Sequence, residues 1–503
     1  MGKIADGDSV IFYDIRGERE VELTRALVDP SFSHFAVRPL GLYFVTLIEY
    51  ARDLGVSVAF PPEEHLKNTL TEVLTSAGFR VVKVSETEKA VHVGFFFNGK
   101  SGEIFSGEER IAVPSPQTAN YAQVPEMSAE GVAEAVERSL IQNGSKVVIA
   151  NLANVDVVGH VEDREAVIEA VRTVDRTLGR LNEVARREKA VLIVTADHGT
   201  VEEWLYPDGT VNTGHTKNPV PFFLADYSGK EGGAILLRPE GELADVAPTV
   251  LDLAGLGVPL EMTGRSLLER DPAAARTPRT KILLLILDGW GSRSEAFGNL
   301  ITEAGTPSFD RLRSSCPGAV LDSFGEAVGM PAGTVGNSEA GHLHLGSGRR
   351  VLLDRVKIDK AIEDGSFFLN EVFLRAMEQA RFDGRALHLM GIVSHYSSHG
   401  TIRHLFALLR MARDAGVENV FIHSFIGRRG ERPESGAIYV EKVESVCGEL
   451  GIGEIVTVMG RYWSLDREEN WGRIEKAYRA LVLGEGTRIS PQGTISPGAR
   501  KNE

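Results

Sequence analysis

Aspartate and histidine residues recur at the ends of short apolar runs in this chain. Asp156 and His160 stand four residues apart after the run "KVVIANL", on one face if the segment forms a helical turn. Asp197 and His198 are adjacent after "VLIVT", and Asp288 directly follows "KILLLIL". Carboxylate and imidazole donors without thiolate suit Mn²⁺, Zn²⁺, Fe²⁺ or Co²⁺. The pattern therefore predicts a site for divalent metal ions.

The number of these donors favours two ions. His215, in the loop "NTGHTKNPVP", brings the set to three Asp and three His residues. A single ion that keeps a position open for a substrate needs fewer ligands, whereas two ions a few ångströms apart account for all six. Any one residue alone is explained more simply as the end of a strand or the cap of a loop. Their recurrence at separate strand ends favours the metal interpretation.

Ser338 is a candidate nucleophile in the Gly-rich segment "GMPAGTVGNSEAGHLHLGSGRR" (329–350). Glycines let the backbone approach a ligand closely, and a Ser at a turn into a helix lies where backbone N–H groups favour an anion. Because a Ser hydroxyl is weakly nucleophilic and the segment has no Gly-x-Ser-x-Gly elbow or P-loop, we expect activation by a metal ion. The alternative is a Gly-rich loop with a capping Ser.

Buried strands are needed to position these residues, and short apolar runs supply candidates. We expect strands at 8–15, 55–60, 89–97, 145–152, 189–199, 281–290, 385–393 and 417–425. Apolar residues at helical spacing predict helices over 129–144 and 164–188. This alternation predicts a mainly parallel α/β architecture, in which ligands gather at the carboxyl ends of the strands.

Length and composition exclude several classes of protein. A chain of 503 residues is too long for one ordinary core, so two domains are expected and three are possible. The net charge of -15 disfavours nucleic acid or an anionic membrane as a partner. Cys316 and Cys447 alone make no disulfide framework, which favours a reducing cytoplasm. No apolar run approaches membrane-spanning length, so we expect a soluble cytoplasmic protein.

Several segments together resemble one known family. They are "LDGWG", "GNSEAGHLHLGSGR", "ETEKAVHVGFFFNG", "VPEMSA", "NLANVDVVGH", "TADHGTVEEW" and "GHTKNPVPF". With them the chain resembles the cofactor-independent (2,3-bisphosphoglycerate-independent) phosphoglycerate mutases of the alkaline phosphatase superfamily, over nearly its whole length. The resemblance implies a two-domain α/β protein, with an alkaline-phosphatase-like three-layer α/β/α domain and a smaller α/β transferase-like domain.

The order of the segments is rotated relative to that family. The strand that ends in "LDGWG" opens the family's proteins, and a segment similar to residues 245–267 closes them. Here the closing segment runs through a linker near 269–280 into the opening strand, which implies a circular permutation, natural or engineered. The expected parts are a transferase-like domain from 1–60 and 353–490, a phosphatase-like metal-binding domain over 61–352, and a C-terminal tail over 491–503.

The resemblance also implies roles for individual residues. One ion is expected at Asp156, His160 and His215, and the other at Asp288, Ser338, Asp197 and His198. Manganese is expected first, with zinc, cobalt, iron or magnesium as alternatives. Ser338 would attack the phosphate of 3-phosphoglycerate and return it to the neighbouring hydroxyl, in a monomer whose partner is this small-molecule substrate. The other catalytic residues would be Lys89 and Arg429, and the substrate-binding residues His399, Arg429, Arg461, Arg467, Arg16, Arg19 and Lys89.

Departures from the family pattern fall in two short segments. "SHYSSHGT" keeps His399 but has His395 where the family has Asp, and "IGRRG" has Gly427 and Gly430 in place of two Asp residues. The resemblance implies that the second of these Asp residues handles protons or binds substrate. Glu431 and His395 are candidates to replace it.

Three hypotheses about function follow from this comparison. The first, which we favour, is a phosphoglycerate mutase with an altered proton relay. The second is a metal-dependent phosphatase or phosphomutase that acts on a related phosphorylated acid. The third is a non-catalytic phosphometabolite-binding protein, which the complete set of metal ligands disfavours.

Overall fold

The computed structural model describes residues 2–62, 65–118, 120–229, 235–269, 278–382, 384–394, 399–427 and 435–487. The chain divides into two compact units, one from residues 1–62 and 354–503 and one from residues 63–353. Each unit contains its own large β-sheet, which confirms the expected two-domain α/β fold. Among the described residues, every helix is too short or too polar to span a membrane.

An eight-stranded sheet forms the centre of the unit over 63–353, in the order β10-β13-β8-β7-β12-β6-β4-β5. The strands are β4 (Arg80–Glu86), β5 (Glu108–Val113), β6 (Lys146–Leu152), β7 (Val191–Thr195), β8 (Val220–Asp226), β10 (Glu240–Glu242), β12 (Lys281–Leu287) and β13 (Gly318–Asp322). The five strands from β7 to β5 run parallel, whereas β8 is antiparallel to both its neighbours. The sheet is therefore mainly parallel, as the sequence predicts.

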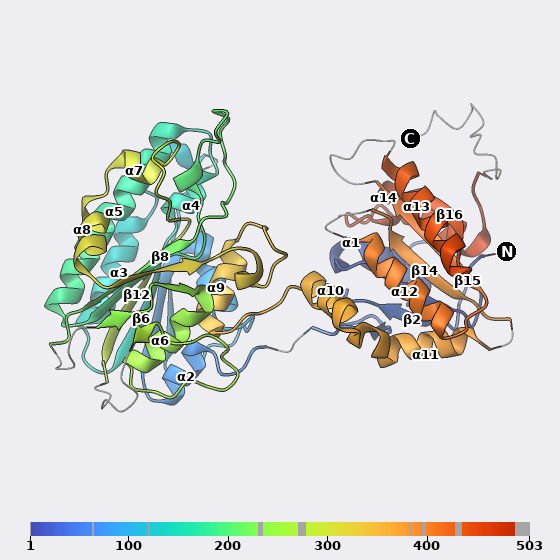
Figure 1. The fold of residues 1–503 in the computed structure, drawn as a ribbon, viewed down its shortest axis with the longest axis horizontal. Coiled ribbons are helices and arrows are strands. Elements are labelled where there is room, and N and C mark those ends of the chain that lie inside the picture. The colour runs from blue at the N-terminus through green and yellow to red at the C-terminus, as the bar shows by residue number, and fades with distance from the viewer. Residues whose placement is uncertain are drawn as a thin grey trace. The chain divides into compact units, whose positions relative to one another are not determined.

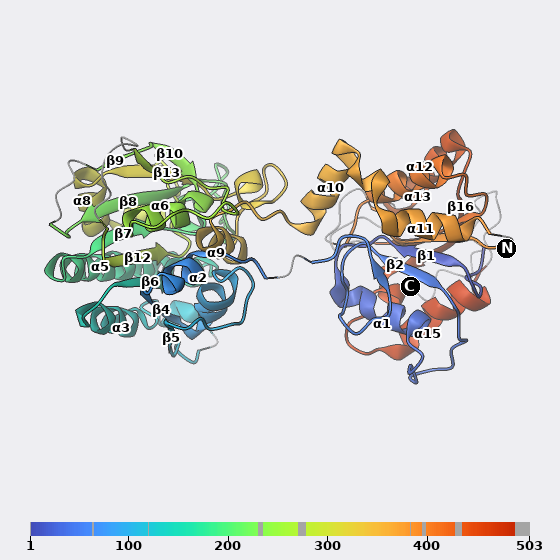
Figure 2. The ribbon, with the colours of Figure 1, turned by 90° about the horizontal axis from the view of Figure 1, so that it is seen from below.

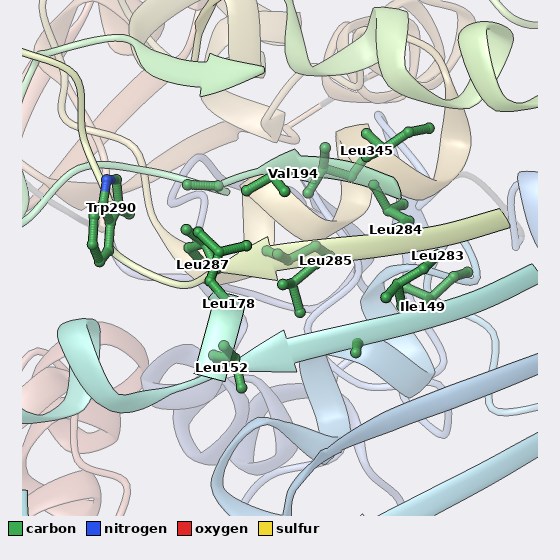
Figure 3. Packing of buried hydrophobic residues seen from close by; sticks show 14 of the residues in the cluster. Ile149, Leu152, Leu178, Val194, Leu283, Leu284, Leu285, Leu287, Trp290 and Leu345 are labelled. Carbon is green, nitrogen blue, oxygen red and sulfur yellow. The ribbon is translucent and has the colours of Figure 1, made fainter. Parts of the chain in front are cut away.

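Strand β12 lies at the centre of this sheet between β6 and β7. Its residues from Ile282 to Leu287 are completely buried, which explains why the run is apolar on both faces. Figure 3 shows side chains of β12 packed among residues of the neighbouring strands and helices, labelled Ile149, Leu152, Leu178, Val194 and Leu345. The continuous apolar run in the middle of the sequence is thus the central strand of the larger domain.

Helices cover both faces of the eight-stranded sheet and complete three layers (Figure 1). One face carries α3 (Ala129–Ile141), α5 (Arg164–Arg187) and α8 (Pro307–Ser315), and the other carries α2 (Leu70–Ser76), α6 (Val246–Leu253) and α9 (Ser338–Ser347). The short elements α4 (Asn154–Gly159), α7 (Leu300–Ala304) and the antiparallel pair β9 (Leu236–Leu237) and β11 (Leu268–Glu269) complete the unit. The observed α3 and α5 end one to three residues before the predicted helices.

The other unit contains a six-stranded, fully parallel sheet in the order β16-β15-β14-β1-β2-β3. The strands are β1 (Ser9–Phe12), β2 (Tyr43–Thr46), β3 (Ser57–Val58), β14 (Leu387–Ile392), β15 (Val420–Ile426) and β16 (Glu454–Gly460). Figure 2 shows α11 (Glu371–Ala380), α12 (Ile402–Asp414) and α13 (Ser435–Leu450) on one face, and α1 (Gly17–Val28) and α15 (Trp471–Tyr478) on the other. The helices α10 (Asp354–Asp364) and α14 (Arg461–Ser464) also belong to this unit.

The predicted strand over 89–97 is wrong. The segment follows a 3₁₀ turn (Thr87–Lys89) and contains a π-helical turn (His92–Phe96). Lys89, Val93 and Phe97 are buried at intervals of four residues, as on one face of a helix. A short apolar run cannot be assigned to a strand or a buried helix by periodicity alone, which explains the error. The predicted strand over 55–60 is reduced to the two residues of β3.

Replacement of a leucine in β12 tests the importance of this central strand. Leu284→Ala removes a fully buried side chain, so we expect the free energy of unfolding of the larger unit to fall by about 2–5 kcal/mol. Leu260→Ala is the matched control, because the side chain of Leu260 is fully exposed and should contribute little. Urea unfolding followed by circular dichroism measures both, and equal values for the two variants would contradict the assignment.

Candidate metal centre

Three parallel strands bring three carboxylates to one edge of the larger sheet. Asp288 directly follows β12, Asp197 lies two residues beyond β7, and Asp156 lies on α4, which follows β6. Because the carboxyl ends of parallel neighbours meet at the same edge, these side chains converge. The backbone N–H of Asp156 donates to the carbonyl of Asp288 at 3.1 Å, which fixes α4 against the end of β12.

Asp156, His160 and His215 form the first group of donors. Oδ1 of Asp156 lies 3.1 Å from Nε2 of His215 and 3.3 Å from Nε2 of His160. The Nδ1 atoms of the two rings lie 2.8 Å and 2.7 Å from the carbonyls of Gly336 and Thr213. A carbonyl only accepts a hydrogen bond, so each Nδ1 carries a proton and each Nε2 of the neutral ring offers a lone pair. This is the tautomer that a metal ligand requires.

Asp197, His198, Asp288 and Ser338 form the second group. Nε2 of His198 lies 3.0 Å from Oγ of Ser338 and 3.6 Å from a carboxylate oxygen of each of Asp197 and Asp288. Ser338 is the first residue of α9, and its Oγ lies 3.3 Å from Oδ1 of Asp288. All four residues are buried. The structure thus places the predicted nucleophile among the predicted ligands.

Lys89 joins the two groups. Its Nζ lies 2.6 Å from Oδ2 of Asp156, 2.8 Å from Oδ1 of Asp288 and 2.7 Å from Oγ of Ser338. Burial would lower the pKa of Lys89, but the carboxylates of Asp288 and Asp156 raise it above its ordinary value. The ammonium therefore stays charged, and it donates to the hydroxyl oxygen of Ser338.

The centre holds more negative than positive charge. Burial would raise the pKa of Asp156, but Lys89 and His198 hold it well below its ordinary value, whereas burial and the charge of Asp197 raise the pKa of Asp288. Oδ2 of Asp197 is buried, with Nδ1 of His342 at 3.2 Å and Nε2 of His198 at 3.6 Å. The ammonium of Lys89 alone does not balance three buried carboxylates, so positive charge on the neighbouring histidines or on bound cations would stabilise the centre. The carboxylate and imidazole donors fit two divalent metal ions.

Two further residues, which the motifs did not identify, contact this centre. Nδ2 of Asn151 donates to Oδ2 of Asp288 at 2.7 Å and lies 3.0 Å from Nε2 of His342. Nδ1 of His342 lies 2.9 Å from the carbonyl of Ser338 and 3.2 Å from Oδ2 of Asp197. The available signals were an Asn inside a buried apolar strand and a His one helical turn after Ser338. Asp197, Asp288 and His342 also offer ligand atoms within 4.8 Å of one another.

Two glycines allow the carboxylates to approach so closely. Gly289 adopts a φ of +80°, and a Cβ there would lie 2.8 Å from the backbone of Asp156. Its N–H donates to Oδ1 of Asp197 at 3.2 Å. A Cβ on Gly341 of α9 would lie 2.6 Å from the carbonyl of Asp197. Side chains at either position would push α4 or α9 away from the centre.

Arginines predicted to bind a substrate gather in the smaller unit. Nε of Arg16 lies 2.9 Å and Nη1 of Arg467 3.2 Å from Oε1 of Glu18. Nη1 of Arg19 donates to the carbonyl of Leu465 at 3.1 Å, which holds it beside the segment that contains Arg467. The side chains of Arg16 and Arg467 are about half exposed, at 47% and 43%. These guanidinium groups can bind an anion that reaches this edge of the sheet.

Of the other residues predicted to bind the substrate, the structure describes Arg461 and His399 but not Arg429. Arg461 begins α14 directly after β16. His399 is buried, and its charge environment includes Arg461, Arg16 and Arg19. Arg429 lies outside the described residues, as do the positions His395, Gly430 and Glu431.

Two family models match separate parts of the chain. The model described as "Metalloenzyme superfamily" matches residues 14–257. The model described as "BPG-independent PGAM N-terminus" matches residues 358–500.

Individual relatives match a little more than half of the chain. A 2,3-bisphosphoglycerate-independent phosphoglycerate mutase of Thermosynechococcus vestitus is 42% identical over 292 residues, covering 57% of this chain and 54% of that protein. One of Moorella thermoacetica is 45% identical over 273 residues, covering 53% and 51%. A solved structure of Leishmania mexicana phosphoglycerate mutase at low cobalt concentration is 30% identical, with a TM-score of 0.39 and coverage of 53% and 52%. The chain spans about half the length of the curated relatives it matches.

Metal content tests the assignment of the donors. After dialysis against Mn²⁺ and removal of free ions, we expect two bound ions per chain by plasma mass spectrometry, because the two donor groups each offer carboxylate and imidazole ligands. Asp288→Ala should reduce that number, since it removes a ligand from the second group.

Asp175→Asn is the matched control for metal content. Asp175 is also a buried carboxylate of this unit, but it accepts hydrogen bonds from the backbone of Ser308 and Phe309 at the start of α8. This variant should keep both ions. Equal metal content in the Asp288 variant and the wild type would contradict the assignment.

Proposed function

We propose that this chain is a cofactor-independent phosphoglycerate mutase, which interconverts 3-phosphoglycerate and 2-phosphoglycerate without 2,3-bisphosphoglycerate. The observation that carries the proposal is the environment of Ser338. Its Oγ lies within 3.3 Å of Lys89, His198 and Asp288 at the N-terminus of α9. The ammonium of Lys89 and the N-terminus of α9 favour a deprotonated hydroxyl and the phosphate that it would attack, and bound ions would offset the charge of the carboxylates.

The proposal includes two divalent ions, for which manganese suits the carboxylate and imidazole donors. Bound ions would supply positive charge to the phosphate and to the oxygen of Ser338. Asp156, His160 and His215 would hold one ion, and Asp288, Ser338, Asp197 and His198 would hold the other. Support comes from two clusters whose ligand atoms lie within 4.8 Å of one another, Asp156 with His198 and His215 and Asp197 with Asp288 and His342, and from the three buried carboxylates.

The chain's own residues would divide the remaining work. Lys89 donates to Oγ of Ser338 and would keep this oxygen directed at the phosphorus atom. Its charge would also offset that of the transferring phosphoryl group, since phosphoryl transfer depends mainly on positioning and electrostatics. In the smaller unit, Arg16, Arg19 and Arg467 would bind the substrate's carboxylate and phosphate oxygens, together with Arg461, Arg429 and His399.

We also propose that the chain is a circular permutant of the family. The model described as the N-terminus of these mutases matches residues 358–500, in the last third of this chain. The smaller unit combines segments from both ends of the sequence, which supports a rearranged order. In this proposal residues 61–352 form the phosphatase-like domain, and residues 1–60 and 353–490 form the transferase-like domain of a cytoplasmic monomer.

A coupled measurement of two products tests the proposed reaction. The purified protein with Mn²⁺ and 3-phosphoglycerate, in the absence of 2,3-bisphosphoglycerate, should form 2-phosphoglycerate with little free phosphate. Ser338→Ala should abolish this product, because it removes the nucleophile. Ser347→Ala is the matched control, since Ser347 is a buried residue of the same helix and its hydroxyl donates to the carbonyl of Arg349.

Other products would identify the alternative functions. Phosphate release without the isomer would indicate a phosphatase, which the Gly residues at 427 and 430 on the substrate side make the second candidate. If neither product forms with any phosphorylated acid while such acids still bind, the protein is a binding protein and the proposed reaction is wrong.

A further inference from the structure

A buried histidine–carboxylate pair lies in the smaller unit, apart from the metal centre. Nδ1 of His399 lies 2.8 Å from Oε1 of Glu20, although the two residues are 379 positions apart in the chain. The side chain of His399 is 3% exposed and that of Glu20 is completely buried. A buried imidazole bonded to a carboxylate through one nitrogen is held in a fixed orientation, as in general-base sites.

The pair lies where the fold of this sheet favours a ligand. Strands β1 and β14 are neighbours, and the chain leaves β1 toward α1 on one face and β14 toward α12 on the other face. The carboxyl ends of two such strands border the crevice in which ligands of open parallel sheets bind. Asp14 and His399 follow these strand ends, and the N–H of Ile15 donates to the carbonyl of His399 at 2.6 Å.

Charged groups surround the pair. Those that face His399 or Glu20 are Asp14, Glu18, Arg16, Arg19 and Arg461, together with the neutral Tyr50. Oδ1 of Asp14 accepts from the N–H of Ile392 at 2.8 Å, and burial and the neighbouring Glu20, to which its side chain is hydrogen-bonded, raise the pKa of Asp14 well above its ordinary value. The pair therefore lies next to the arginines that the proposed function assigns to an anionic substrate.

Burial shifts both titrations of the pair. It raises the pKa of Glu20 to about 8 and lowers the pKa of His399 to about 4. These shifts favour a protonated Glu20 beside a neutral His399 at neutral pH. Such a pair can release that proton and recover it at neutral pH.

The proposed reaction needs one group that both gives and takes a proton. Resting on that function, we infer that His399, oriented by Glu20, protonates the glycerate oxygen that leaves and then deprotonates the neighbouring hydroxyl that attacks. His399 is thus a catalytic residue and Glu20 a positioning residue. His399 would take the role of the carboxylate that the family resemblance leads one to expect at position 430, where this chain has Gly.

The proton balance closes over one cycle. Deprotonated Ser338 forms a bond to phosphorus, the bond from phosphorus to the first glycerate oxygen breaks, and that oxygen takes the proton of the pair. His399 then takes the proton of the neighbouring hydroxyl, whose oxygen attacks the phosphoserine. The Ser338 oxygen leaves with its electron pair, so Ser338 and the pair return to their initial states.

Other described histidines of the smaller unit have different surroundings. His388 and His423 lie 2.9 Å apart inside the sheet, and His388 also lies 3.1 Å from Asp8. His404 lies 3.2 Å from Asp359, on α10. The charge environment of His404 includes Arg355 and Arg403, but these arginines lie at Asp359 and are not among those assigned to the substrate.

Steady-state kinetics of His399→Gln with 3-phosphoglycerate tests the inference. We expect kcat to fall by about 10²- to 10⁴-fold, with little change in KM, because the variant loses proton transfer rather than binding. His404→Gln is the matched control, since His404 is also a buried histidine with a carboxylate partner in this unit, and it should retain the wild-type kcat. An unchanged kcat in His399→Gln, or a change in KM alone, would overturn the inference.

A substrate with a good leaving group separates proton transfer from misfolding. Release of p-nitrophenol from p-nitrophenyl phosphate needs no proton, so His399→Gln should retain single-turnover release at the wild-type rate while it loses the mutase reaction. Parallel loss of both reactions would mean general damage and would overturn the inference. If the wild type forms no 2-phosphoglycerate, the proposed function is wrong. If the wild type and the His399 variant both form it at the same rate, only the role of His399 is wrong.

The pH profile tests the role of Glu20. Glu20 holds the proton of the pair below about pH 8 and loses it above, so the wild-type kcat should fall as the pH rises through about 8. In Glu20→Gln only His399 can hold the proton, and its pKa is lower, so the fall should begin at lower pH. A profile that does not move in this variant would show that Glu20 serves structure alone.

Discussion

Three carboxylates buried at one sheet edge are the constraint on which the larger domain depends. Asp156, Asp197 and Asp288 are taken out of water by the fold, and isolated buried carboxylates are costly unless opposite charge compensates them. Lys89 provides part of that charge from the turn before the π-helical segment. The negative charge that remains suits divalent cations, which in the proposed function would bind the phosphate.

The surrounding architecture follows from the need to keep these groups close. A central strand that is apolar on both faces anchors Asp288, while the parallel order of its neighbours brings the other two carboxylates to the same end. Gly289 and Gly341 remove the side chains that would separate the strand ends from α4 and α9. Rigid strands thus position the ligands, and a helix N-terminus positions Ser338.

The sequence allowed much of this centre to be predicted, because strand ends leave a local signal. An apolar run followed by Asp, or by Asp-His, indicates both a buried strand and the residue at its carboxyl end. The parallel order of the strands then brings these residues to one edge of the sheet. The segment over 89–97 was mistaken for a strand because a short apolar run has no distinguishing period. Asn151 and His342 were missed because each looks like an ordinary member of its element.

The Glu20–His399 pair could not be predicted for a different reason. It joins residues from opposite ends of the chain, and neither residue lies in a segment whose spacing suggests a partner. Only the order of strands in the six-stranded sheet, which places β1 beside β14, brings them together. A pair that depends on strand order can therefore be identified only in the structure, whereas candidate metal ligands at strand ends can be predicted from the sequence.

The central claim is that Ser338 carries the phosphoryl group between the two positions of the substrate. The most direct measurement is to mix the Mn²⁺-loaded protein with 3-phosphoglycerate, quench it in acid within one turnover, and map the phosphorylated residue by peptide mass spectrometry. The account predicts one phosphoryl group on the peptide that contains Ser338, with the modification on that residue. Phosphorylation of another residue, or formation of 2-phosphoglycerate with no phosphorylated protein at any time, would contradict it.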